Sequence, residues 1–176
     1  MMKKKLPYLL VTAAILLLAG VYLVYHRMLK RPLWGDPKAF VTVKTGVDEK
    51  KNIVLEDGSL VTLNAGTTVR IQKDISYTRA IEIVDGEVFF DVQKNEERPL
   101  IIRSQGVTTS TPGASFTISA YKRLNNVSVG VISGKVSIEN ESSALGELGM
   151  NEELVYDKAS GSHKKVALEE SLTSWR

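Results

Sequence analysis

Apolar and polar side chains alternate over most of the chain from residue 39 to residue 157. A period of two places successive side chains on opposite faces of an extended backbone, so this pattern predicts strands with one buried face. The runs are rich in Val, Ile, Thr, Phe and Tyr, which suit a pleated surface. They are AFVTVKT (39–45), NIVLEDGSLVTLNAGTTVRI (52–71), RAIEIVDGEVFFDV (79–92), PLIIRS (99–104), SFTISAY (115–121), VSVGVISGKVSIEN (127–140) and ELVYD (153–157). No helical period competes with them, so the predicted fold class is mainly β.

Three glycines divide these runs into pairs of strands. Asp57-Gly58, Asp85-Gly86 and Ser133-Gly134 are each flanked by alternating apolar residues, and such dipeptides favour tight turns between neighbouring strands. A solenoid of stacked β-arches would produce this repeated pattern of strand, glycine turn and strand, and so would an antiparallel sandwich. We therefore predict a solenoid-like or sandwich-like stack of short strands and hairpins, preceded by one transmembrane helix.

That helix is expected over residues 6–25, a run of 20 residues without a charged side chain. At 1.5 Å per residue it would be about 30 Å long, the thickness of the hydrocarbon core of a bilayer. A cleaved signal peptide is the alternative, but its apolar region is shorter and ends in an A-x-A-like site, which is absent here. Because a short tail before a first anchor usually stays inside, we expect residues 1–5 to be a cytoplasmic tail, 26–38 a juxtamembrane linker and the remainder to lie outside the cytoplasm.

Charge and composition exclude several classes of protein. Six of the 23 basic residues lie within residues 1–31, which contain no acid, so the 20 acidic residues outnumber the basic ones in the body. A nucleic-acid-binding body would need a concentrated positive surface, so no nucleic acid is expected as a partner. The absence of cysteine excludes disulfides and thiolate metal sites. Two histidines, His26 and His163, offer little for a catalytic triad or a zinc site.

The remaining candidates for chemistry favour structural roles. Gly113-Ala114-Ser115-Phe116 resembles a nucleophile elbow but lacks its final glycine. The acid pairs Asp85/Glu87 and Glu96/Glu97 fall in predicted turns or loops, where solvated acids are the norm. We therefore predict no catalytic, cofactor-binding or metal-ligating residue, and a binding domain rather than an enzyme.

The last residues follow a different pattern. Leu168, Leu172 and Trp175 are spaced i, i+4, i+7, as on one face of a helix, and the sequence offers Trp175 no obvious packing partner. Residues 39–160 are thus predicted to form the β domain. Residues 161–176 are predicted to form a tail that starts a helix or belongs to a truncated following domain.

Several blocks of the body, in this order, resemble the FecR domain, the extracytoplasmic domain of transmembrane anti-sigma regulators, especially of the Bacteroidetes type. The matching residues are Leu55, Asp57, Gly58, Ser59, Val61, Leu63, Asn64 and Ala65, then Gly86, Glu87, Phe90 and Val92, then Arg98 and Pro99, then Gly113 and Phe116, then Gly134 and Val136. Most of these residue types serve turns or cores, and Asn64 is expected at a left-handed corner. In the late turn Leu148–Glu153, Asn151 stands near where the family has Pro-Gly, and Asn tolerates the same left-handed φ.

The resemblance implies a function. The family relays an envelope signal, in iron and TonB-dependent signalling, from an outer-membrane transducer to a sigma factor. It therefore implies a single-pass inner-membrane protein with its bulk in the periplasm, which contacts a protein partner there and regulates transcription. Members carry a sigma-binding domain before the membrane helix and a transducer-contacting domain after the FecR domain. We expect this chain to lack both, so a sigma factor is a partner in the family rather than here. The alternatives are a stand-alone envelope module that binds glycan or protein, and an enzyme that uses acidic residues.

Overall fold

The computed structural model describes Gly20 and residues 39–73, 79–172 and 174–175. The chain divides into two compact units, residues 1–37 and 38–176, and only the second is described in detail below. The predicted cytoplasmic tail (1–5), transmembrane helix (6–25) and linker (26–38) lie outside the described residues, apart from Gly20. In the described part of the chain, no helix has the length and apolar character needed to cross a membrane.

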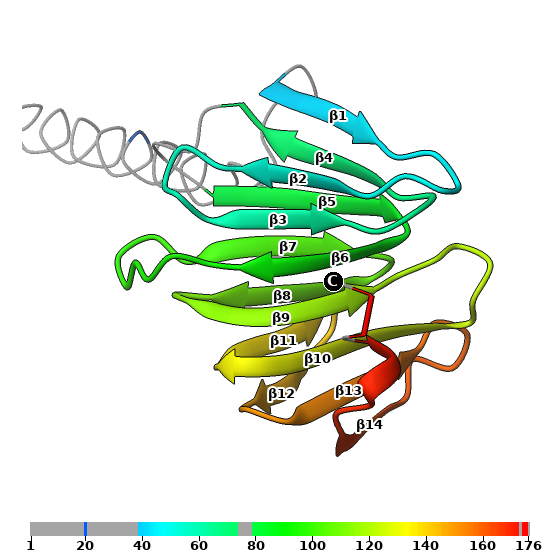
Figure 1. The fold of residues 1–176 in the computed structure, drawn as a ribbon. Coiled ribbons are helices and arrows are strands. Elements are labelled where there is room, and N and C mark those ends of the chain that lie inside the picture. The colour runs from blue at the N-terminus through cyan, green and yellow to red at the C-terminus, as the bar shows by residue number, and fades with distance from the viewer. Residues whose placement is uncertain (1–19, 21–38, 74–78, 173, 176) are drawn as a thin grey trace, which may run out of the picture. The chain divides into compact units, whose positions relative to one another are not determined.

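The strands form two seven-stranded sheets, here named sheet A and sheet B (Figure 1). Sheet A consists, in spatial order, of β1 (Phe40–Lys44), β4 (Thr68–Gln72), β5 (Arg79–Asp85), β7 (Leu100–Ser104), β8 (Val107–Thr111), β11 (Val136–Asn140) and β12 (Ala144–Leu148). Sheet B consists of β14 (His163–Ala167), β13 (Glu152–Asp157), β10 (Asn126–Gly134), β9 (Ala114–Ser119), β6 (Glu87–Asp91), β3 (Leu60–Leu63) and β2 (Lys51–Val54). A short 3₁₀ helix, η2 (Glu170–Leu172), follows β14.

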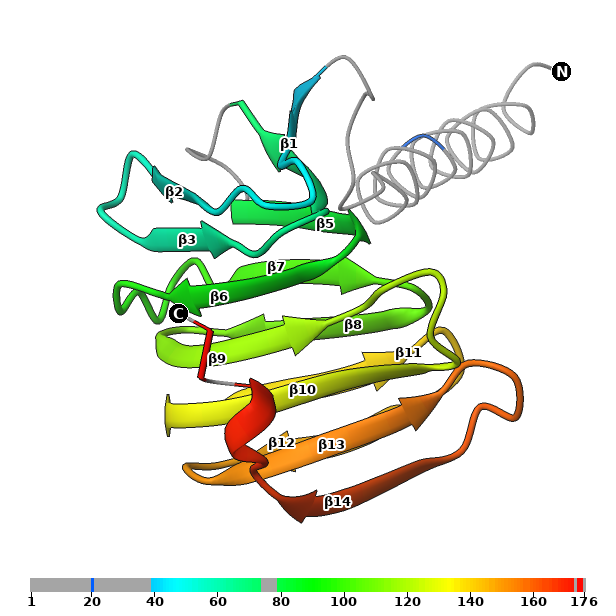
Figure 2. The same cartoon turned by 45° about the vertical axis from the view of Figure 1, so that its right-hand side comes forward.

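Each sheet is ordered along the sequence, which combines the two predicted architectures. The chain adds a strand or a hairpin to one sheet, crosses to the other and continues in the same direction, so the layers face each other as in a sandwich and grow as in a solenoid (Figure 2). Strand β6 is a single strand in sheet B between two strands of sheet A. As a result its flanking strands, β5 and β7, pair in parallel, whereas the other strand pairs of the two sheets are antiparallel.

The three glycine turns do not share one geometry. Asp57-Gly58 joins β2 to β3, which pair as a hairpin within sheet B. Gly86 and Gly134 instead lie where the chain crosses between the sheets, from β5 to β6 and from β10 to β11. A hairpin turn at Ser133-Gly134 was therefore a wrong prediction, and at Gly86, where β-arches and hairpins were both open, the structure has an arch between the sheets. The two strands joined at each of these glycines lie in different sheets. Their apolar faces pack against each other across the core, and the strands do not pair side by side.

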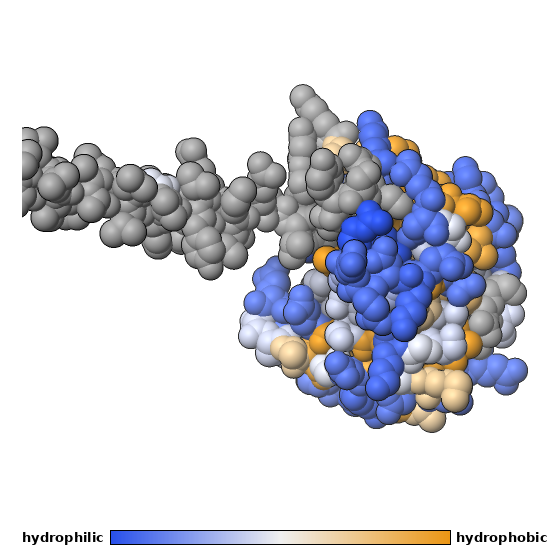
Figure 3. Space-filling view, turned by 90° about the vertical axis from the view of Figure 1, so that its left-hand side faces the viewer, coloured by the Kyte–Doolittle hydropathy of each residue, from blue (hydrophilic) through white to orange (hydrophobic). Residues whose placement is uncertain are grey.

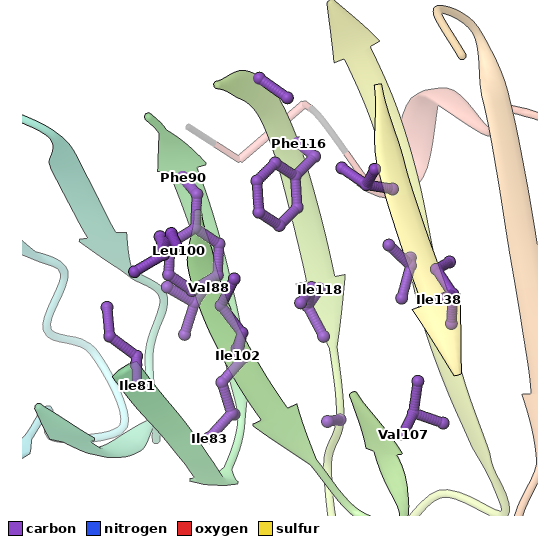
Figure 4. Packing of buried hydrophobic residues seen from close by; sticks show 14 of the residues in the cluster. Ile81, Ile83, Val88, Phe90, Leu100, Ile102, Val107, Phe116, Ile118 and Ile138 are labelled. Atoms are coloured by element: carbon purple, nitrogen blue, oxygen red, sulfur yellow. The ribbon is translucent and has the colours of Figure 1, made fainter. Parts of the chain in front are cut away.

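The core fills the space between the two sheets with the inward residues of every alternating run (Figure 4). Phe90 from β6 and Phe116 from β9 are completely buried, and their rings stack with centroids 5.1 Å apart. Phe90 is thus the inward member of the Phe89-Phe90 pair, and Phe89 lies on the outer face of sheet B. Truncating either stacked ring would cost about 3–5 kcal/mol.

Three strands extend the sheets beyond the predicted runs. Strand β8 has the sequence VTTST, and its inward residues include the buried Thr109 and Thr111. Strand β12 is interrupted by a register shift in its pairing with β11. Strand β14 begins at the exposed His163 and pairs with β13, so residues 163–167 belong to sheet B.

Candidate functional site

The turn Asp57-Gly58-Ser59 carries the first block of the resemblance. The Asp57 carboxylate accepts a hydrogen bond from the Ser59 backbone N–H at 2.9 Å. Gly58 has φ of +84°, a region that glycine enters without steric cost. The block is therefore the connection of the β2–β3 hairpin, as expected from its sequence.

Asp57 also holds a buried arginine that the sequence analysis did not single out. Arg79, the first residue of β5, is 1% exposed and forms an ion pair with Asp57 at 2.6 Å. Its guanidinium donates to the backbone carbonyls of Arg98 at 2.7 Å and Gln93 at 3.2 Å. These residues, with Ser59, form the Arg79 cluster, which ties the β2–β3 turn and the β6–β7 loop to the start of β5. The only sequence signal for it is an arginine that opens an apolar strand.

The Arg79 cluster shifts the ionisation of its acid. Burial by itself raises the pKa of the Asp57 carboxyl, but the bonds from Arg79 and Ser59 outweigh it and hold that pKa below its ordinary value. Strand β5, and with it Arg79, begins at the end of the stack that faces left in Figure 1. Figure 3 shows that the surface at this end is mainly hydrophilic, with scattered apolar residues. Three oxygen partners replace part of the water of the buried arginine, and its Nη2 has no hydrogen-bond partner in the described part of the chain.

A second polar centre, the Glu87 corner, lies at the opposite end of β5 and β6. It comprises Asn64, Thr67, Gly86, Glu87 and Tyr121. The Asn64 side-chain amide donates to the Glu87 carboxylate at 2.7 Å, and the Thr67 hydroxyl exchanges hydrogen bonds with the Glu87 backbone at 3.1 Å. The Tyr121 hydroxyl donates to the Ala65 carbonyl at 3.2 Å. These bonds join the β3–β4 crossing to the β5–β6 crossing.

Gly86 is the residue that permits this corner. A Cβ at Gly86 would lie 2.3 Å from Thr67 Oγ1 and 2.5 Å from Thr67 Cα, and the φ of Gly86 is +111°. The two crossings can therefore touch only where a side chain is absent. Asn64 is not left-handed, so that prediction was wrong; the Asn64 side chain contributes through its hydrogen bonds to Glu87 and to the Ala65 N–H instead. Asn151 has φ of +65°, which confirms the prediction for the late turn.

The Glu87 carboxylate is buried and, unlike Asp57, forms no ion pair among the residues that the structure describes. Burial raises the pKa of this carboxyl above its ordinary value, although the Asn64 amide and the Trp175 indole lower it. The indole N–H is buried beside this carboxyl but makes no hydrogen bond of ordinary geometry. Burial also raises the pKa of the Tyr121 hydroxyl, and the Glu87 charge adds to that shift. Trp175 thus has packing partners that the sequence did not reveal.

A polar groove lies on the outer face of sheet A. The strand register places Arg70, Glu82, Arg103, Thr108 and Glu139 side by side across five strands. Arg70 and Glu82 form an ion pair at 2.7 Å, with both side chains about a third exposed. The other three, with Glu82, line an open hollow of about 670 Å³, here named the sheet A groove. Its alternating charges suit a polar ligand.

The other candidate residues are engaged structurally. Asp85 accepts a bond from the Lys122 backbone N–H at 2.8 Å, and Glu96 pairs with Lys94 on the surface. The hydroxyl of Ser115, the nucleophile-like serine, donates to Asp91 at 2.7 Å. In residues 39–73, 79–172 and 174–175, no three His, Asp or Glu side chains gather as metal ligands would. The expectation that the chain has no catalytic residue, cofactor or metal stays a prediction.

The fold and its corners define a class of protein: a double-layered β domain whose motif residues build its turns, crossings and core. A model described as FecR protein matches residues 41–137, and this chain belongs to that family. Crystal structures of a proposed anti-sigma factor from Parabacteroides distasonis, at 1.65 and 2.50 Å resolution, are similar to it. They share 31% and 30% sequence identity with TM-scores of 0.72, over 77% of this chain. The matched region spans 64% of those solved chains. No match was found among curated proteins.

Proposed function

We propose that this chain is a membrane-anchored regulatory module in which a periplasmic FecR domain relays an envelope signal by contact with a partner protein. The observation that carries the proposal is the family match over residues 41–137. The similarity to a proposed anti-sigma factor supports a regulatory role. The partner is a periplasmic protein, which in the family is the signalling domain of a TonB-dependent transducer.

The module acts by binding rather than catalysis. The acids that would serve an enzyme hold the fold together: Asp57 pairs with Arg79, Asp85 caps a backbone N–H, and Glu87 joins two crossings. A general acid or base must instead be free to exchange a proton with a substrate. The surfaces available for contact are the outward side chains of the two sheets that remain exposed.

Anchoring rests on the uncharged run of residues 6–25 between basic flanks. Alkaline phosphatase and green fluorescent protein fused in turn after Arg176 test it, because the first is active only outside the cytoplasm and the second fluoresces when made inside. We expect membrane-bound phosphatase activity and no fluorescence. A fluorescent fusion without phosphatase activity would show that residues after 25 lie in the cytoplasm. Active phosphatase released from the membrane fraction would show that residues 6–25 do not anchor the chain.

The regulatory role is tested by transcript profiling of a strain with and without the gene. We expect a limited set of promoters with a shared recognition sequence to change several-fold, and the wild-type chain to restore them. A second complementing chain, with residues 1–31 replaced by a cleavable signal peptide, separates the roles of domain and anchor. Unchanged transcripts after deletion would refute the regulatory proposal, whereas full complementation by the secreted form would refute only the need for the anchor.

The sheet A groove favours a second function, an envelope module that binds glycan. Its mixed charges and its volume of about 670 Å³ suit a short polar chain. Retention of the detergent-solubilised chain on immobilised peptidoglycan fragments tests this function. Arg103→Ala with Glu139→Ala should abolish retention, and Lys94→Ala, which removes a charge outside the groove, should not. Equal retention of the wild type, the double variant and Lys94→Ala would contradict glycan binding in the sheet A groove.

A further inference from the structure

The outer face of sheet B carries a row of residues that the strand register places side by side. Across β3, β6, β9, β10, β13 and β14 this row reads Thr62, Phe89, Thr117, Gly130, Glu153 and Val166. An outer face is normally wet, yet Thr117 is completely buried and Glu153 is 4% exposed. Something other than the core must therefore cover the middle of the row.

The cover is formed by residues 168–172 and 174–175, here named the strap. After β14 the chain turns back and runs over the face of sheet B (Figures 1 and 2). Its described part contains the turn η2 and places the buried Leu172 on the sheet. The sequence predicted Leu168, Leu172 and Trp175 on one face of a helix. The described residues contain only the three-residue turn η2 there, and Leu168 lies before it, yet Leu168 and Leu172 both reach the same residue of β10.

That residue is Gly130, which forms the seat of the strap. A Cβ built at Gly130 would lie 2.3 Å from Leu168 Cδ1 and 3.3 Å from Leu172 Cδ1. Its φ lies outside the left-handed range, so the backbone does not require glycine there. The missing side chain serves the leucines instead: it leaves a depression that two branched apolar side chains fill from outside the sheet.

Polar contacts fasten the strap at both ends. The Leu168 N–H donates to the Asn151 carbonyl at 2.9 Å, and the Glu169 N–H donates to the Glu153 carboxylate at 3.2 Å. At the far end the Trp175 carbonyl accepts from the Lys50 ammonium, which also lies 5.7 Å from the centre of the indole ring. The strap therefore reaches from β13 to the residue that precedes β2.

Burial under the strap leaves polar groups poorly satisfied. The Thr117 hydroxyl is buried without a hydrogen-bond partner in the part of the chain that the structure describes, and the Trp175 indole N–H is buried beside the Glu87 carboxylate without a hydrogen bond of ordinary geometry. A buried polar group without a partner opposes burial, whereas water would satisfy both groups if the strap lifted. The two leucines favour the closed strap, and the poorly satisfied polar groups and the lost chain entropy oppose it.

We infer that this face of sheet B is a binding site for a short amphipathic peptide segment, and that the strap is its intramolecular ligand. The segment it takes carries two leucines four residues apart for the Gly130 seat and a tryptophan three residues further for Lys50. Tethering keeps the strap at a high effective concentration, so it masks the site from a segment of the same chemistry on another protein.

The test uses the full-length chain in detergent and a fluorescent synthetic peptide of residues 166–176. Leu168→Asp with Leu172→Asp releases the strap, and this variant should bind the peptide at least about 10-fold more tightly than the wild type, whose site is occupied. Adding Gly130→Val should abolish binding. Adding Gly149→Ala, at a glycine whose new Cβ would meet only the Glu152 carboxylate at 3.7 Å, should not.

If a variant binds the peptide poorly, hydrogen exchange of the same proteins shows whether the strap is released and whether sheet B is still folded. Gly130→Val alone should speed amide exchange across 168–175 at least about 10-fold while the β9 and β10 amides stay protected. Failure of the peptide to bind a strap-released chain with a protected sheet would overturn the inference. So would unchanged strap exchange in Gly130→Val, or loss of protection throughout sheet B, which would make the strap an integral part of the fold.

Discussion

The Arg79 cluster and the Glu87 corner lie at opposite ends of β5 and β6, and each holds a carboxylate at a turn of the chain, partly buried for Asp57 and buried for Glu87. Asp57 meets a buried guanidinium at 2.6 Å, whereas Glu87 meets the neutral side-chain amide of Asn64 at 2.7 Å. The pKa of Asp57 is lowered and that of Glu87 is raised. Burial alone therefore does not set the role of an acid; the charge of its partner decides whether ionisation stabilises the fold or opposes it.

The two regions also differ in how tightly the backbone is packed around their glycines. Gly86 and Gly58 both have positive φ, but a Cβ would meet Thr67 at 2.3 Å in the first and only Gln93 Cγ at 3.6 Å in the second. Gly58→Ala should cost about 1–2 kcal/mol, the ordinary penalty of a left-handed residue. Gly86→Ala adds a clash with backbone and should lower the free energy of unfolding by more than about 3 kcal/mol. Urea denaturation measures the free energy of unfolding of both variants. Equal losses in Gly58→Ala and Gly86→Ala would show that the Glu87 corner can widen to accept a side chain.

Removing the acid of the Arg79 cluster should have the next largest effect. Asp57→Asn leaves a buried guanidinium without its counter-charge, and we expect a loss of about 2–3 kcal/mol. The exposed pair on sheet A provides the control, because Glu82→Gln should cost less than about 1 kcal/mol. Combining Asp57→Asn with Arg79→Met should restore part of the loss, since no buried charge remains. A double variant less stable than Asp57→Asn would mean that the carbonyl bonds of Arg79 outweigh the ion pair.

The pH dependence of the unfolding free energy in acid tests the same ion pair, Asp57 with Arg79. Because the folded-state pKa of Asp57 lies below its ordinary value of 3.8, its contribution is fully present above pH 3.8 and is lost as the pH falls through the folded-state pKa. The difference in unfolding free energy between wild type and Asp57→Asn should therefore shrink below pH 3.8. Thermal unfolding followed by circular dichroism measures it; a constant difference down to pH 2 would contradict the role of the charge.

The Glu87 corner should show the opposite pH dependence with a smaller amplitude. A raised pKa favours the protonated acid in the folded state, so this contribution is present below the ordinary value of 4.5 and is lost as the pH rises through the folded-state pKa. Glu87→Gln keeps an acceptor for Asn64 without a charge. Relative to wild type it should gain about 0.5–1 kcal/mol at pH 7 and less at pH 4. A gain that is larger at pH 4 than at pH 7 would reverse the assigned shift.

Much of the strand content could be predicted, because a period of two is a local property of the chain. The strands that were missed lack that signal. In β8 the inward positions next to Val107 are Thr109 and Thr111, which pack in the interior although they are polar. Strand β12 is broken by its register shift, and β14 is an exposed edge with two lysines. For these strands the neighbouring strands supply the pairing that their own pattern does not predict.

The candidate site was less predictable than the fold. The matching residues Asp57, Asn64 and Glu87 could be recognised, but their partners could not: Arg79 is 22 residues from Asp57 in the sequence, and Trp175 reaches Glu87 from the other end of the body. Such contacts depend on how the layers stack, so no spacing in the sequence encodes them. The seat at Gly130 gave no signal because its role is the absence of a side chain beneath another segment.

By itself, the sequence determined that the body is built from short alternating strands punctuated by glycine, and that its motif residues belong to the FecR pattern. Only the tertiary structure decided which glycine turns a hairpin and which crosses between sheets, although Asp57-Gly58 and Asp85-Gly86 are the same dipeptide. The reason is physical: a turn residue permits a reversal of the chain, but the burial of the two strands it joins determines whether they pair in one sheet or pack across the core.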